Sequence, residues 1–154
     1  MLQFIWSIPE MGNPSEQKLY ILRGGLFIRT QEGDFPCSKW QDNPLVQIAN
    51  FLTNAVLLVK MANSVPRYHS FHPYYVVAKP PTNGMLTLRF LRSYAPENLE
   101  KLPPLILPFK EYGDILLETG QTMLDACQAR GIGIASEMYY LENSLRSLGA
   151  VISD

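Results

Sequence analysis

Strands are predicted where apolar and polar positions alternate along the chain. The clearest case is residues 85–91, in which Leu86, Leu88 and Phe90 alternate with polar side chains. A period of two places these three on one face of a strand and the polar side chains on the other. Runs rich in aromatic and branched residues predict further strands over residues 2–8, 18–22, 26–30 and the latter half of 68–78.

Glycine and proline positions predict where the strands break. Residues 80–84 form a turn, so the strands on either side of it are expected to pair as an antiparallel hairpin. The pair Gly24-Gly25 is either a tight turn or a bulge within one longer strand. Residues 95–108 contain four prolines and are predicted to be irregular, with a short helical turn over 96–101.

Apolar residues at intervals of three and four predict helices. The first begins after Asn43, whose side chain can accept from the free amides of the first turn. Pro44 suits the first helical position, where the missing N–H costs nothing. Leucine, isoleucine and valine then recur at helical spacing to about residue 62, and Pro66 lies at the end or just past it.

A second, longer helix is predicted from Pro108 to about Arg130. Gly113 and Gly120 interrupt it, each at a cost of about 1 kcal/mol relative to alanine. Gly131 is suited to the C-terminal cap, because glycine adopts the left-handed backbone that ends many helices.

A third helix, capped by Ser136 and ending before Gly149, completes the predicted order of strands, helix, strands and two helices. This order is typical of an α+β fold and not of a βαβ repeat. We expect one domain over residues 1–154. Its antiparallel sheet would have about five strands, packed against two to three helices.

Composition and charge exclude several classes of protein. No apolar run approaches the roughly 18 residues of a membrane span, since the longest, Ala55–Val59, ends at Lys60. The net charge of −1 lacks the excess of basic residues expected of a nucleic-acid-binding chain. No Lys or Arg precedes the first apolar stretch, so no export signal is predicted and the expected compartment is the cytoplasm. Cys37 and Cys127 are too far apart in sequence for a paired-cysteine metal motif.

The only histidines, His69 and His72, are three residues apart, which on a helix would place both on one face. Prolines at 66 and 73 argue against a helix, and no third ligand is evident, so we expect neither a metal site nor catalysis. The sequence has no phosphate-binding loop, dinucleotide motif or nucleophile elbow, and no cofactor is expected. A small hydrolase-like enzyme built on the two histidines, with Cys37 as a further candidate, stays open as the alternative.

Four acidic residues form the strongest candidate for a binding surface. Glu111, Asp114, Glu118 and Asp125 fall within roughly one sixth of the circumference of the second predicted helix, and no Lys or Arg lies between the first and the last. Such a face is either simply solvated or a docking ridge for a basic protein.

Aromatic residues form a second candidate surface. Trp40, Tyr68 and Tyr74 stand out, with Phe71 and Tyr75 nearby. Tyrosine and tryptophan are enriched at protein interfaces, although packing within the sheet would explain them equally. Residues 68–78 contain no Lys or Arg, so these aromatics are not expected to stack on nucleic-acid bases.

The stretch from Phe35 to Leu45 leads into an apolar helix and then an aromatic strand hairpin. Over residues 20–92 this layout is similar to that of small bacterial immunity proteins, which neutralise the toxins of polymorphic or contact-dependent systems. The resemblance implies a non-enzymatic, cytoplasmic protein that sequesters a cognate toxin domain by occlusion. A secretion chaperone or assembly subunit is the other binding function that such an architecture admits.

Overall fold

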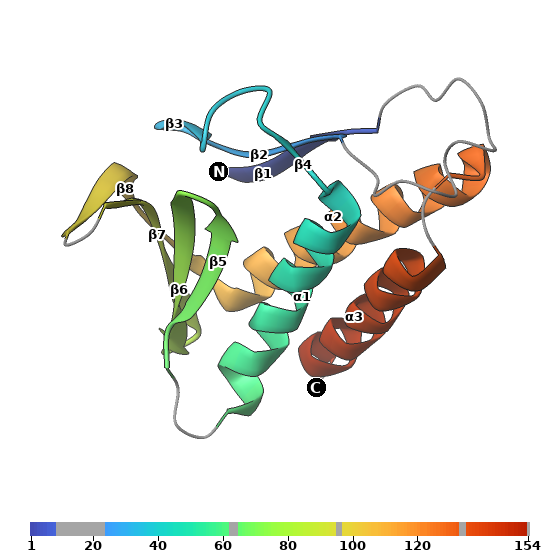
Figure 1. Cartoon of the computed structure of the whole chain (residues 1–154). Coiled ribbons are helices and arrows are strands. Elements are labelled where there is room, and N and C mark those ends of the chain that lie inside the picture. The colour runs from blue at the N-terminus through green and yellow to red at the C-terminus, as the bar shows by residue number, and fades with distance from the viewer. Residues whose placement is uncertain (9–23, 62–64, 95–96, 133–134, 154) are drawn as a thin grey trace.

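The computed structural model describes residues 1–8, 24–61, 65–94, 97–132 and 135–153. The strand predicted over residues 18–22 lies outside these ranges. Within them the fold is α+β, as predicted, with its strands divided between two antiparallel sheets of four strands each (Figure 1). The elements in chain order are β1 (Leu2–Ser7), β2 (Gly24–Thr30), β3 (Gly33–Phe35), β4 (Gln41–Asp42), α1 (Pro44–Lys60), β5 (Arg67–Phe71), β6 (Tyr74–Thr82), β7 (Met85–Tyr94), β8 (Glu97–Pro108), α2 (Phe109–Arg130) and α3 (Ala135–Ser153).

Sheet A, formed by β1 to β4, is built around β2, which pairs with each of the other three strands. The glycine pair Gly24-Gly25 belongs to this central strand, opposite Ser7 of β1 and Gln41 and Asp42 of β4. A Cβ at Gly24 would lie 2.2 Å from the carbonyl oxygen of Ser7, so the close approach of β1 requires glycine there.

Sheet B has the order β5-β6-β7-β8, and the predicted hairpin of β6 and β7 is confirmed. Asn83 and Gly84 join these strands with φ values of 53° and 76°. Positive φ at both central residues is the requirement of a tight type I′ hairpin turn. The turn is shorter than the predicted one, because residues 80–82 still belong to β6.

The prediction of an irregular segment with a helical turn over 96–101 is wrong, since residues 97–108 form strand β8. Proline is tolerated here because β8 is an edge strand, which needs to donate hydrogen bonds on one side only. In the pairing, Leu88 lies opposite Leu105 and Phe90 opposite Leu102, with a register shift between them. Pro103 and Pro104 therefore fall in a bulge of the ladder.

The first two predicted helices are confirmed with their caps. Asn43 Oδ1 accepts from the backbone N–H of Val46, and Pro44 occupies the first position of α1. Helix α2 ends at Gly131, whose φ of 64° is left-handed.

The predicted limits of the third helix are wrong. Helix α3 begins at Ala135, so Ser136 lies in its first turn, and it continues through Gly149 to Ser153. A glycine with nothing near it is tolerated inside a helix at a modest cost, and no atom lies within 4 Å of a Cβ built on Gly149.

The hydrophobic core is one connected cluster with α1 at its centre. Figure 1 shows sheet B on one side of α1, α3 on the other and α2 running behind. Phe35 of sheet A packs against Phe71 and Phe90 of sheet B at ring-centroid distances of 6.4 and 5.2 Å, which joins the two sheets. None of the helices in the described ranges is long and apolar enough to cross a membrane.

The two glycines within α2 are contact points between helices. A Cβ at Gly120 would lie 2.7 Å from Cδ2 of Leu145 on α3 and 3.3 Å from Cδ1 of Leu52 on α1. A Cβ at Gly113 would lie 2.0 Å from Cδ1 of Ile152 on α3. Glycine lowers the helix propensity of α2 at these positions, but the absence of a side chain allows the three helices to pack closely.

Candidate functional site

The four acidic residues of α2 are all exposed to solvent. They lie opposite the stripe that α2 buries against α1, α3 and β1, because their spacing of three, four and seven follows the helical period. We call this surface the acidic α2 face; it comprises Glu111, Asp114, Glu118 and Asp125.

Neighbouring side chains engage two of these carboxylates. Lys110 Nζ lies 2.7 Å from Asp114 Oδ2, and Gln121 Nε2 donates to Asp125 Oδ1 at 2.9 Å. The Lys110–Asp114 pair is open to water on both sides, so it neutralises Asp114 at little gain in stability. Glu111 and Glu118 form no ion pair with the described residues, which leaves their charge available to a partner.

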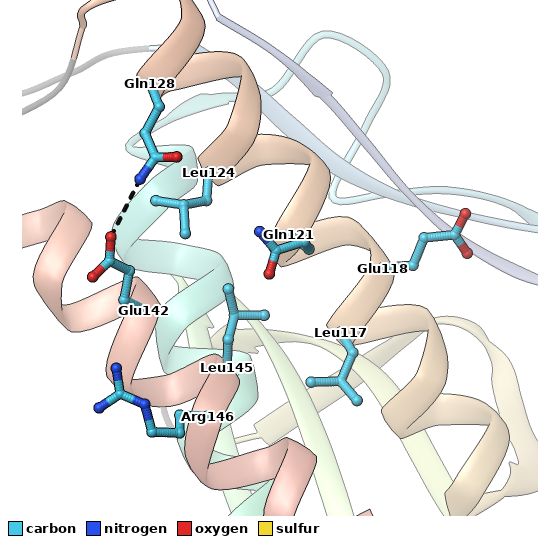
Figure 2. Close-up of a pocket in the computed structure, with 8 residues that line it drawn as sticks. All are labelled: Leu117, Glu118, Gln121, Leu124, Gln128, Glu142, Leu145 and Arg146. Atoms are coloured by element: carbon cyan, nitrogen blue, oxygen red, sulfur yellow. Dashed lines mark hydrogen bonds between the residues drawn. The ribbon is translucent and has the colours of Figure 1, made fainter.

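Next to the acidic face, α2 and α3 enclose an open groove of about 660 Å³. Figure 2 shows Leu124 and Leu145 pointing toward each other across it, with Leu117 farther along its floor. Gln128 Nε2 donates to Glu142 Oε1 at 3.3 Å and bridges one end. We call this feature the α2–α3 groove.

Glu118 links the groove to the acidic face. It lines the groove, yet Figure 2 shows its carboxylate directed away from α3. The groove therefore borders the acidic face, and a partner bound there would also meet the polar residues of the groove wall, Gln121, Gln128, Glu142 and Arg146. Sequence analysis missed this groove, although Leu117 and Leu124 repeat at an interval of seven beside the acidic residues and so share a helix face.

The two histidines do not share a site. His69 is buried on β5 with 5% of its surface exposed, while His72 is exposed where β5 turns into β6. Strand β5 ends at Phe71, so His72 belongs to the exposed turn that follows, whereas the ring of His69 packs against α1. Among the residues described, no three His, Cys, Asp or Glu side chains gather in a way that would hold a metal ion.

His69 is held as a neutral ring by its surroundings. It stacks on Phe51 with ring centroids 3.5 Å apart, and its Nε2 donates to Gln47 Oε1. The other end of the Gln47 amide donates to Asp42 Oδ2 at 2.9 Å and to the Ser70 carbonyl at 3.2 Å, which fixes its orientation. Burial lowers the pKa of His69 to about 3.

The cysteines are both free, with Cys37 exposed and Cys127 buried in the core. Burial raises the pKa of the Cys127 thiol to about 11, so this thiol is protonated at neutral pH. The polar partner of His69 is Gln47 and not Cys37.

The aromatic residues are divided between the core and the surface. Tyr74 packs edge-on against Phe35 and Trp40 at centroid distances of 5.8 and 5.6 Å, where sheets A and B meet. Tyr68 projects from β5 with 63% of its surface exposed. Because α2 packs against β7 and β8 at the other end of sheet B, Tyr68 and the acidic α2 face lie on separate parts of the molecule.

Comparison of the chain with models of protein families, with curated proteins and with solved structures finds no match.

Proposed function

We propose that this protein is a protein-binding module that holds a basic surface of another protein on the acidic α2 face. The observation that carries this proposal is the position of the four exposed carboxylates beside an open groove with a leucine floor. Acidic surfaces attract and select cationic partners, while a buried apolar contact supplies affinity.

The rigidity of the surface favours binding by occlusion. Helix α2 is packed against α1, α3 and β1, so its exposed face is formed before a partner arrives. A preformed surface loses little conformational entropy on binding. The concrete form of the proposal is an immunity protein of the bacterial cytoplasm that covers the cationic, functional face of a cognate toxin domain. The similarity of residues 20–92 in layout to immunity proteins supports this form.

The test is purification of the tagged protein, in mild salt, from the cells that make it. The wild type is compared with Glu118→Lys and with Glu32→Lys, which changes the net charge equally from the exposed turn between β2 and β3. We expect one stoichiometric partner with wild type and with Glu32→Lys, and about tenfold less of it with Glu118→Lys. Equal recovery of the partner with both variants would show that the partner does not bind to the acidic α2 face.

Expression of the recovered partner then tests the immunity function. A toxin domain expressed alone should arrest growth, and co-expression of this protein should restore it. A partner that is harmless alone would contradict the immunity function and favour a chaperone or assembly subunit. For the purified pair, reversal of Glu118 should slow association at low salt and affect dissociation much less, because exposed charges act mainly on encounter.

A further inference from the structure

A second hollow lies on the other side of α1, far from the acidic α2 face in the fold. It has a volume of about 290 Å³ and lies between α1, β5 and Tyr140 of α3. This volume is just below the roughly 300–1,000 Å³ that small-molecule sites occupy, so only a small ligand fits. We call it the β5 pocket.

The lining of the β5 pocket is polar and uncharged. Amide side chains come from α1, hydroxyl groups come from α1, β5 and α3, and His69 is neutral. Most small-molecule sites are lined mainly by apolar side chains. A neutral polar lining fits a ligand that is itself neutral and rich in hydrogen-bonding groups, because a charged ligand would find no countercharge among the lining residues.

The hydrogen bonds already made in the pocket define what the ligand must offer. Because His69 Nε2 donates to Gln47, Nδ1 of the neutral ring is an acceptor, and it has no partner among the described residues. Asn50 accepts from the Tyr140 hydroxyl at 2.8 Å through Oδ1, which leaves its amide nitrogen free to donate. The side chain of Asn54 makes no hydrogen bond within the described chain and offers both a donor and an acceptor.

We propose that the β5 pocket binds a single sugar ring, whose hydroxyl groups donate to Nδ1 of His69 and exchange hydrogen bonds with Asn50 and Asn54. Each sugar hydroxyl can donate and accept, which matches a lining that offers a bare acceptor, a free donor and a group capable of both. This site is independent of the acidic α2 face.

The test is a titration of the ¹⁵N-labelled protein with methyl α-D-glucoside and with N-acetylglucosamine at millimolar concentrations, followed by amide chemical shifts. We expect saturable shifts confined to residues 47–54 of α1, 68–70 of β5 and the neighbourhood of Tyr140. Asn54→Leu keeps a good helix former in α1 and should weaken binding about tenfold, since it removes hydrogen bonds to the ligand. Gln121→Leu, an equivalent change on α2, should leave the affinity unchanged.

Three outcomes would overturn the proposal. The first is the absence of saturable shifts with either sugar, and the second is unchanged shifts in Asn54→Leu. The third is a shift of the pocket residues by uracil, a flat neutral molecule with donors and acceptors, when the sugars cause none. The thermal unfolding midpoint of each variant is measured alongside, so that a loss of binding is distinguished from a loss of folding.

Discussion

Helix α1 is held on its two sides by different kinds of contact. Toward α2 it meets apolar side chains and a glycine, with Leu52 of α1 lying close to Gly120. Toward β5 and α3 hydrogen bonds are added to the apolar contacts, from His69 to Gln47 and from Tyr140 to Asn50. The contact with α2 is therefore defined by shape, whereas the contacts with β5 and α3 also depend on polar pairing.

The difference determines what can disturb each side. An apolar contact is indifferent to pH and sensitive to volume, because closely packed atoms cannot move apart without loss. A buried polar network tolerates small changes of shape better than it tolerates the loss of a partner or a change of protonation. A change of pH or of a hydrogen-bonding partner should therefore act on the polar contacts of α1, and a change of side-chain volume on its apolar contacts.

The largest effect is expected from acidification, acting through His69. Its folded pKa of about 3 lies below the ordinary value of 6.5. Between these pH values the unfolded chain binds a proton at His69 that the folded chain does not. The contribution of His69 to the free energy of unfolding is therefore complete above about pH 6.5 and is lost as the pH falls toward about 3. When the pH falls from about 7 to about 5, protonation of His69 in the unfolded chain should lower the free energy of unfolding by on the order of 2 kcal/mol.

Denaturant titrations of wild type and His69→Phe at these two pH values check this prediction. The variant keeps an aromatic ring against Phe51 and has no ionisable group at position 69. Its loss of stability on acidification should be smaller than that of the wild type by the same amount. Equal losses in both proteins would show that His69 does not carry the pH dependence.

The next effect is expected at the start of α1, where Asn43 serves two elements. Its Oδ1 accepts from Val46 N at 3.2 Å, and its Nδ2 donates to Glu137 Oε1 of α3 at 2.8 Å. Asn43→Ala should lower the unfolding free energy by about 1–2 kcal/mol, because it removes the cap and leaves Glu137 without this donor. Asn43→Ser keeps a capping oxygen and should recover about half of the loss. No difference between the two variants would contradict the capping role.

These examples show which parts of the fold could be predicted from the sequence. Asn43-Pro44 is a local signal, because a cap and the first helical residue act within one turn of the chain. Strand β8 was missed because its prolines exclude a central strand but not an edge strand, and edge position depends on the whole sheet. The division of the strands into two sheets depends on long-range pairing in the same way.

The candidate site could be predicted only in part. The exposure of the acidic residues follows from helical period, which is local. The groove beside them requires α3, and the neutral state of His69 requires its burial against Phe51 of α1. Gly120 could be recognised as a cost to the helix, whereas its function as a contact point depends on Leu52 and Leu145, which are distant in sequence.

A smaller effect, with opposite signs at two positions, is expected on the side defined by shape. Gly120→Ala places a Cβ 2.7 Å from Leu145 Cδ2 and should destabilise the protein by about 1 kcal/mol despite its better helix propensity. Gly149→Ala is the matched control in α3, where a Cβ meets nothing within 4 Å, and it should stabilise by about 0.5–1 kcal/mol. Denaturant midpoints distinguish the two, and stabilisation by both substitutions would mean that the helices pack less closely at Gly120.

The smallest effect on stability is expected at the acidic α2 face, which neither packs nor pairs with the core. Glu118 lies one turn beyond Asp114 on the same exposed side, and like charges at this spacing repel. The ion pair of Asp114 with Lys110 reduces this repulsion and keeps the effect small. Glu118→Gln should therefore raise the unfolding free energy by about 0.2–0.5 kcal/mol at low salt, and high salt should remove the gain because exposed charges are screened. The same substitution should weaken binding of a basic partner, so stability and binding change in opposite directions. If Glu118 instead served the fold, the substitution would lower stability and leave binding unaffected. That result would show that the binding surface is not on α2.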